Sequence, residues 1–180
     1  MASAATKSKT DTAVPGKPEP LPTGFVSPFK RVPMEGRVDD ALACIAILTG
    51  HTLAQVTEEA IAIGYPAHGP AFPTEAQIAM LCMKLGGLVA TKYKEFKTWL
   101  ALPEVALVYV DWSDDMEVGR HIVCHAVRAT EDRKAFRYLI DPAHWLPAER
   151  HFTTSLELVE PDYFIGISKA NTTAIKGGKV

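Results

Sequence analysis

Every residue from Ala41 to Leu48 is apolar, and this run constrains the fold more than any other feature of the sequence. A helix over these residues would be apolar on all sides, so it must lie buried. Asp39 is a suitable N-cap for such a helix, and Gly50 is a suitable stop. The sequence therefore predicts one central helix around which the rest of the domain packs.

Two further helices are predicted by capping signals. Thr52 and Gln55 have the spacing of a capping box, which predicts a helix through about residue 63. Thr74 and Gln77 repeat the signature before the apolar stretch 78–85, and the glycine pair 86–87 ends that third helix.

The pattern changes to strands after residue 87. Apolar runs bounded by turn residues predict strands at 88–93, 105–110, 119–128 and 135–140, with weaker candidates at 151–154 and 163–168, and a helical turn within 94–102. The connections are too short for crossovers, so the sheet should be antiparallel. Helices followed by strands predict an α+β fold.

The chain divides by composition into three segments. With 180 residues it has room for one domain and a short appendage. Residues 1–35 are rich in proline and lack apolar periodicity, so we expect an extended arm that docks onto a partner protein or a larger assembly such as a phage particle. Residues 36–168 form the domain, and 169–180 form a flexible tail.

Charge and cysteine usage bear on partners and compartment. A net charge of -2 without a long basic run predicts no binding to nucleic acid. No stretch approaches the ~18 apolar residues of a membrane span, and the N-terminus lacks the apolar region of a signal peptide. The spacing of Cys44, Cys82 and Cys124 is wide, which fits reduced thiols better than a disulfide framework. We expect a cytoplasmic protein, or a virion component.

Three stretches together resemble the papain-like cysteine peptidases of the C39-like group. That group has D-C-G-x-x-x-x-A-x-x-x-G near its start, then G-H-x-V-V, then a strand ending in D-P. The matching stretches are DDALACIAILTG (39–50), GRHIVCHAV (119–127) and YLIDP (138–142). The resemblance implies a papain-like fold of the NlpC/P60- and C39-like kind, with His121 as general base and Asp141 as the carboxylate that orients it. Arg120 separates His121 from its glycine, a small departure.

The nucleophile position departs from that pattern. Aligned on the spacing to Gly50, the family's catalytic cysteine falls on Asp40. A helix N-terminus favours a carboxylate as it favours a thiolate, but a carboxylate cannot carry out thiolate acyl transfer. Residues 28–38 also contain no glutamine or asparagine for an oxyanion hole. We therefore predict a catalytically degenerate peptidase-like domain that acts as a structural or binding module, with Asp40 and His121 as an ion pair.

Cys44 offers the alternative of an active cysteine peptidase or amide hydrolase that uses His121 and Asp141. Cys44 lies four residues beyond Asp40, which on a helix is about 6 Å deeper on nearly the same face. A thiol packed there has a raised pKa and is inert. A third alternative is an α+β scaffold unrelated to peptidases.

We predict no metal and no cofactor. His121 and His125 share one face of their strand while Cys124 points to the other, so the three cannot converge on zinc. Asp114, Asp115 and Glu117 form an acidic turn beside this strand, interpreted as a hydrated turn, and Trp112 and Trp145 are candidates to wall a groove.

Overall fold

The structure is a computed structural model, and it describes residues 16–170. Within that range the fold is mixed α+β, with three α-helices followed by an antiparallel sheet of seven strands. The helices are α1 (Asp40–Thr49), α2 (Leu53–Ala62) and α3 (Glu75–Gly86). The strands are β1 (Leu88–Ala90), β2 (Lys94–Glu95), β3 (Val105–Ser113), β4 (Val118–Val127), β5 (Phe136–Ile140), β6 (Phe152–Thr153) and β7 (Pro161–Lys169).

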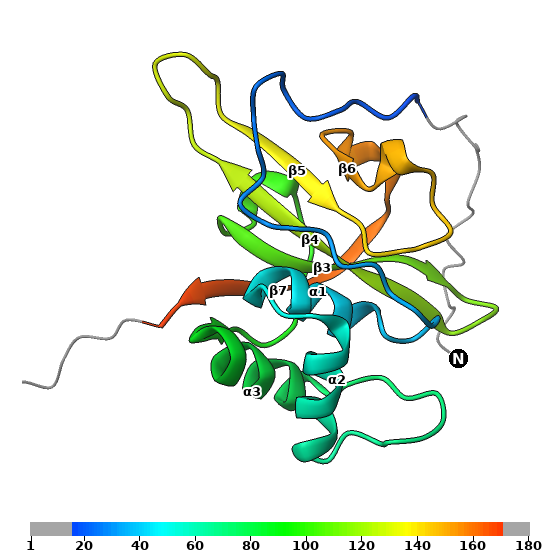
Figure 1. Ribbon diagram of the computed structural model, residues 1–180. Coiled ribbons are helices and arrows are strands. Elements are labelled where there is room, and N and C mark those ends of the chain that lie inside the picture. The colour runs from blue at the N-terminus through cyan, green and yellow to red at the C-terminus, as the bar shows by residue number, and fades with distance from the viewer. Residues whose placement is uncertain (1–15, 171–180) are drawn as a thin grey trace, which may run out of the picture.

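The sheet has the order β1-β7-β3-β4-β5-β6, and β2 also pairs with β7. Figure 1 shows the helices gathered on one side of this sheet. On the helix side, Leu107, Val123 and Ile165 pack against α1 in the main core. On the other side, Val108 and Ile122 belong to a smaller core that loop residues such as Trp99 cover. The sheet thus has two buried faces, and alternate residues of β3, β4 and β5 belong to different cores.

Helix α1 is buried along almost its whole length, as its apolar composition predicts. Residues 40–47 are each at most 2% exposed, and Gly50 ends the helix in the left-handed conformation. The capping boxes at Thr52 and Thr74 are both formed. The helical turn predicted within 94–102 is present as a 3-10 turn at Trp99–Ala101, and strand β2 before it was not predicted.

The proline-rich segment before α1 packs on the domain itself. Phe25, Phe29 and Met34 contact the main core, and the Glu19 carbonyl accepts a hydrogen bond from the Thr154 N–H at 3.0 Å. Figure 1 shows this segment running past β5 and β6. The domain therefore begins before the predicted boundary at residue 36. The apolar side chains are irregularly spaced on an extended backbone, so they give no periodic signal. Two stretches lie outside the described residues: 1–15, the first part of the predicted arm, and 171–180, most of the predicted tail.

Replacing Phe25 with alanine should lower the free energy of unfolding by about 1 to 2 kcal/mol, below the ~3 to 5 kcal/mol of a fully buried phenylalanine because Phe25 is only partly buried. Its ring packs edge-on against Phe136 with centroids 5.0 Å apart. Urea denaturation would measure the change. Val26, which is 85% exposed, supplies the control: Val26→Ala should stay within about 0.5 kcal/mol. Equal effects of both changes would mean that the segment is not anchored by Phe25.

Within residues 16–170 no single helix is long and apolar enough to cross a membrane. Helices α1 and α2 meet that test of length and composition only as a pair, bent by 110°.

Candidate functional site

The first turn of α1 meets strand β4 through a carboxylate. Asp40 is 1% exposed, and its Oδ2 accepts hydrogen bonds from both the backbone N–H and the ring Nδ1 of His121, each at 2.6 Å. Because a carboxylate only accepts, the ring proton must lie on Nδ1. Asp40 therefore fixes the tautomer and the orientation of the imidazole.

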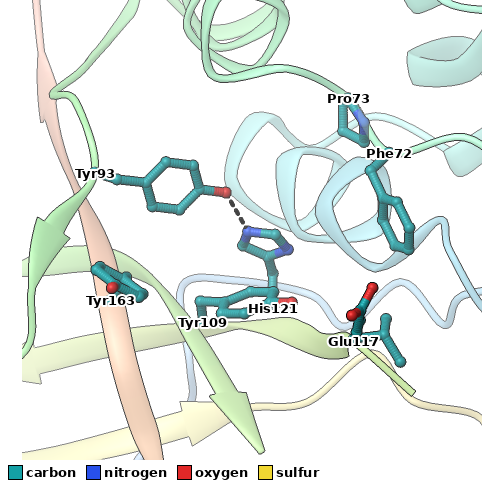
Figure 2. Close-up of a pocket in the computed structure, with 8 residues that line it drawn as sticks. Phe72, Pro73, Tyr93, Tyr109, Glu117, His121 and Tyr163 are labelled. Atoms are coloured by element: carbon teal, nitrogen blue, oxygen red, sulfur yellow. Dashed lines mark hydrogen bonds between the residues drawn. The ribbon is translucent and has the colours of Figure 1, made fainter. Parts of the chain in front are cut away.

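The other ring nitrogen of His121 is also occupied. Nε2 lies 2.6 Å from the hydroxyl of Tyr93, as Figure 2 shows. Burial, and then the charge of Asp40, raises the pKa of Tyr93, so this hydroxyl keeps its proton and shares a hydrogen bond with Nε2. Asp40, His121 and Tyr93 thus form one continuous chain of hydrogen bonds.

Cys44 lies one turn deeper in α1 and contacts the backbone of His121 instead of its ring. The thiol is fully buried and donates to the His121 carbonyl oxygen at 3.4 Å. Burial, followed by the charge of Asp40, raises the pKa of Cys44 well above its ordinary value. Burial also raises the pKa of Cys82 to about 12 and that of Cys124 to about 11. All three thiols are held protonated.

Asp141 does not orient His121, which corrects the role implied for it above. Its carboxylate accepts from Arg120 Nη2 at 2.7 Å and from the Ala143 N–H at 2.9 Å. The strand register explains the difference. Val123 pairs with Ile140, so the next residue, Asp141, belongs to the face of Arg120, opposite that of His121. Burial raises the pKa of Asp141, and the charge of Arg120 opposes this shift.

Arg120 joins two carboxylates on this second face. Its Nη1 donates to Asp111 Oδ2 at 2.7 Å, in addition to the bond with Asp141. Arg120 and Asp141 are both buried, whereas the Asp111 side chain is 40% exposed. Arg120, Asp111 and Asp141 thus form a charged cluster on one face of β4. The chain of hydrogen bonds from Asp40 to Tyr93 lies on the other face.

A pocket of about 410 Å³ opens beside the Tyr93–His121 hydrogen bond. Its floor is a row of side chains across three strands, because the register pairs Tyr109 with His121 of β4 and with Tyr163 of β7. The remaining walls come from Phe72, Pro73, Tyr93, Glu117 and Val118, and Figure 2 shows most of these side chains surrounding the imidazole.

Gly119 is required for the position of Tyr109. Its N–H donates to the Tyr109 hydroxyl at 2.7 Å, and a Cβ at residue 119 would lie 2.9 Å from the Tyr109 ring. The same Cβ would lie 2.7 Å from the Val110 carbonyl oxygen, so a larger residue would displace the backbone of β3 or the Tyr109 ring.

Of the eight residues that line the pocket, sequence reasoning predicted only His121 as a functional residue. Tyr109 could have been found from the register of the β3–β4 hairpin, whereas Tyr93 lies in a connection without a distinctive pattern. Glu117, interpreted above as part of a hydrated turn, lines the pocket. Trp145 lines an adjoining hollow, while the Trp112 indole donates to Asp114 at 2.9 Å.

Within residues 16–170 no group of three or more histidine, cysteine or acidic side chains is arranged to hold a metal ion. No protein-family model matches the chain, and no curated protein matches it in sequence.

Proposed function

We propose that this chain is a catalytically degenerate, papain-like domain of the C39-like kind that acts as a binding or structural module for a protein partner. The observation that carries the proposal is the contact between Asp40 Oδ2 and His121 Nδ1 at 2.6 Å. A carboxylate stands at the start of the buried helix, where the family pattern has its cysteine. Both ring nitrogens of His121 have partners, a carboxylate at Nδ1 and a tyrosine hydroxyl at Nε2, and neither partner is a thiol.

The Arg120–Asp141 pair supports the same proposal. In the family pattern G-H-x-V-V the histidine directly follows the glycine, and the residue that directly follows Gly119 is Arg120. Asp141, from the D-P stretch, contacts Arg120 at 2.7 Å. A guanidinium remains charged at any physiological pH and cannot accept a proton from a nucleophile. The carboxylate of the D-P stretch is therefore paired with Arg120, on the sheet face opposite His121, and does not orient the imidazole.

The alternative, an active hydrolase that uses Cys44, requires an accessible thiol next to an imidazole. Cys44 is buried, its pKa is raised, and it contacts the carbonyl oxygen of His121. A thiolate at this depth would be desolvated and would lie near the negative charge of Asp40, and both effects disfavour it. These contacts favour a structural role for Cys44.

Alkylation of the native protein with iodoacetamide near neutral pH tests the proposal. We expect Cys44, Cys82 and Cys124 to react at least about 100-fold more slowly than an exposed thiol, because burial raises the pKa of each thiol and keeps the reagent from reaching it. Leu100 is 92% exposed, so Leu100→Cys supplies the rate standard within the same chain. Mass spectrometry of peptides would locate each modification.

The outcome that overturns the proposal is fast, selective alkylation of Cys44 that His121→Ala abolishes. Hydrolysis of a peptide ester lost in both Cys44→Ser and His121→Ala would identify the active hydrolase instead.

A further inference from the structure

The pocket beside His121 is walled by aromatic rings from four separate parts of the chain. Phe72 comes from the loop before α3, Tyr93 from the connection between β1 and β2, Tyr109 from β3, and Tyr163 from β7. Figure 2 shows the four rings arranged around one space, with the imidazole of His121 in their midst. The faces of aromatic rings are electron-rich and attract cations.

The charges around this pocket are negative. Glu117 lines it, and the Glu75 carboxylate accepts the backbone N–H of Tyr93 at 2.7 Å. The charges of Asp40 and Glu75 act on Tyr93, and those of Asp40 and Asp162 act on Tyr109. No lysine or arginine is among the residues that line it.

The basic residues nearby line a different hollow. Arg37, Arg120 and Arg150 belong to the adjoining depression, which shares Phe72, Glu117 and Val118 with the aromatic pocket. Arg120 is neutralised there by Asp111 and Asp141. A cation is therefore favoured in the aromatic pocket and disfavoured next to it.

Glu117 occupies a backbone position that favours glycine. Its φ is 50°, in the left-handed region where a side chain is strained. Strain of this kind is concentrated at functional sites. Here the strained residue brings a carboxylate to the aromatic pocket.

The hydroxyl groups in the pocket wall limit which cation fits. The Tyr93 hydroxyl shares a hydrogen bond with His121 Nε2, and the Tyr109 hydroxyl accepts one from the Gly119 N–H. An unmodified ammonium needs acceptors for its three N–H groups, and the acceptors in the lining are Glu117 and the tyrosine hydroxyls, two of which are already engaged. A fully methylated ammonium has no N–H groups and needs only aromatic faces and a negative field.

We propose that this pocket binds a quaternary ammonium group. The proposal deepens the proposed function, on which it rests, by naming the ligand chemistry of the binding module. Two sources have this chemistry, a free trimethylammonium compound such as choline and a trimethyllysine side chain on a partner protein.

Isothermal titration calorimetry on the full chain separates these sources. The ligands are choline, N-acetyl-trimethyllysine methylamide, its unmethylated lysine counterpart, and 3,3-dimethylbutanol, which has the shape of choline without its charge. We expect a quaternary ligand to bind at least about fivefold more tightly than its uncharged or unmethylated counterpart. The tighter of choline and the trimethyllysine compound identifies the source. Equal binding of choline and dimethylbutanol would overturn the proposal.

Substitutions test the walls one at a time. Tyr163 and Phe72 are about half exposed, and Tyr163→Leu and Phe72→Leu should each weaken binding by about two- to fivefold. Trp145 is similarly exposed but lies in the adjoining hollow, so Trp145→Leu is the matched control and should leave affinity unchanged. Unchanged affinity in both wall variants would contradict the assignment.

Two substitutions of Glu117 distinguish a role in ligand binding from a purely structural role. Glu117→Gln and Glu117→Gly should both weaken binding by about two- to fivefold, a modest effect because the side chain is exposed. Glu117→Gly should also raise the melting temperature by about 2 to 4 °C, since glycine adopts positive φ without strain. Full affinity in Glu117→Gln would remove the carboxylate from the site.

The result is separable from that of the alkylation experiment. Inert thiols without cation binding would refute the quaternary-ammonium pocket alone, whereas a reactive Cys44 would refute the degenerate-peptidase proposal whatever the pocket binds.

Discussion

Replacing Arg120 with methionine is expected to lower the free energy of unfolding by about 3 to 5 kcal/mol. Arg120 is the buried cationic partner of Asp141, which is 4% exposed, and its removal leaves that carboxylate unpaired in a low-dielectric environment. Asp111 loses the same partner at less cost, because its side chain is 40% exposed and water can replace the guanidinium. The loss should therefore come mainly from Asp141.

Urea denaturation of two matched variants separates this cause from a general loss of an arginine. Arg128 pairs with Glu104 on the surface, where the arginine side chain is 87% exposed, so Arg128→Met should cost under about 1 kcal/mol. Adding Asp141→Asn to Arg120→Met removes the unpaired charge while keeping an acceptor for the Ala143 N–H, and should recover a large part of the loss. A double variant no more stable than Arg120→Met would show that the stem of Arg120, not its charge, matters.

Replacing Asp40 with asparagine is expected to lower the free energy of unfolding by about 1.5 to 3 kcal/mol. The Oδ2 atom of Asp40 accepts two hydrogen bonds from His121, and both residues are buried. An amide oxygen can keep the backbone bond, but the charge-assisted bond to Nδ1 is lost. The carboxylate of Asp115 is exposed, so Asp115→Asn should have almost no effect.

Nitrogen NMR of the imidazole ring gives a second measurement for the same substitution. With Asp40 present the proton lies on Nδ1, and with asparagine the preference for this tautomer should weaken. Unchanged stability together with an unchanged tautomer would mean that Tyr93 alone holds the ring.

The elements that sequence reasoning predicted correctly are those with strong local signals. The apolar run 41–48 could only be a buried helix, and the two capping boxes located the starts of α2 and α3. The four-residue spacing of Asp40 and Cys44 placed both on one face of α1, and the structure has both in contact with residue 121.

The features that could not be predicted depend on long-range register and on irregular backbone. Which face of the sheet holds Asp141 is decided by the pairing of Val123 with Ile140, and a shift of one residue would reverse it. Tyr93 reaches His121 from a connection without periodicity, and Phe25 reaches the core from an extended segment. No local pattern encodes such contacts, because partners distant in sequence decide them.

The position of β7 between β1 and β3 affects how this chain folds. This strand pairs with β1, β2 and β3, and its residues 161–169 are the last of the sheet to be synthesised. Until it docks, β3 has one open edge, which offers unpaired peptide groups to other chains. Pairing across so large a sequence separation is slow, so newly made molecules are exposed to aggregation during this interval.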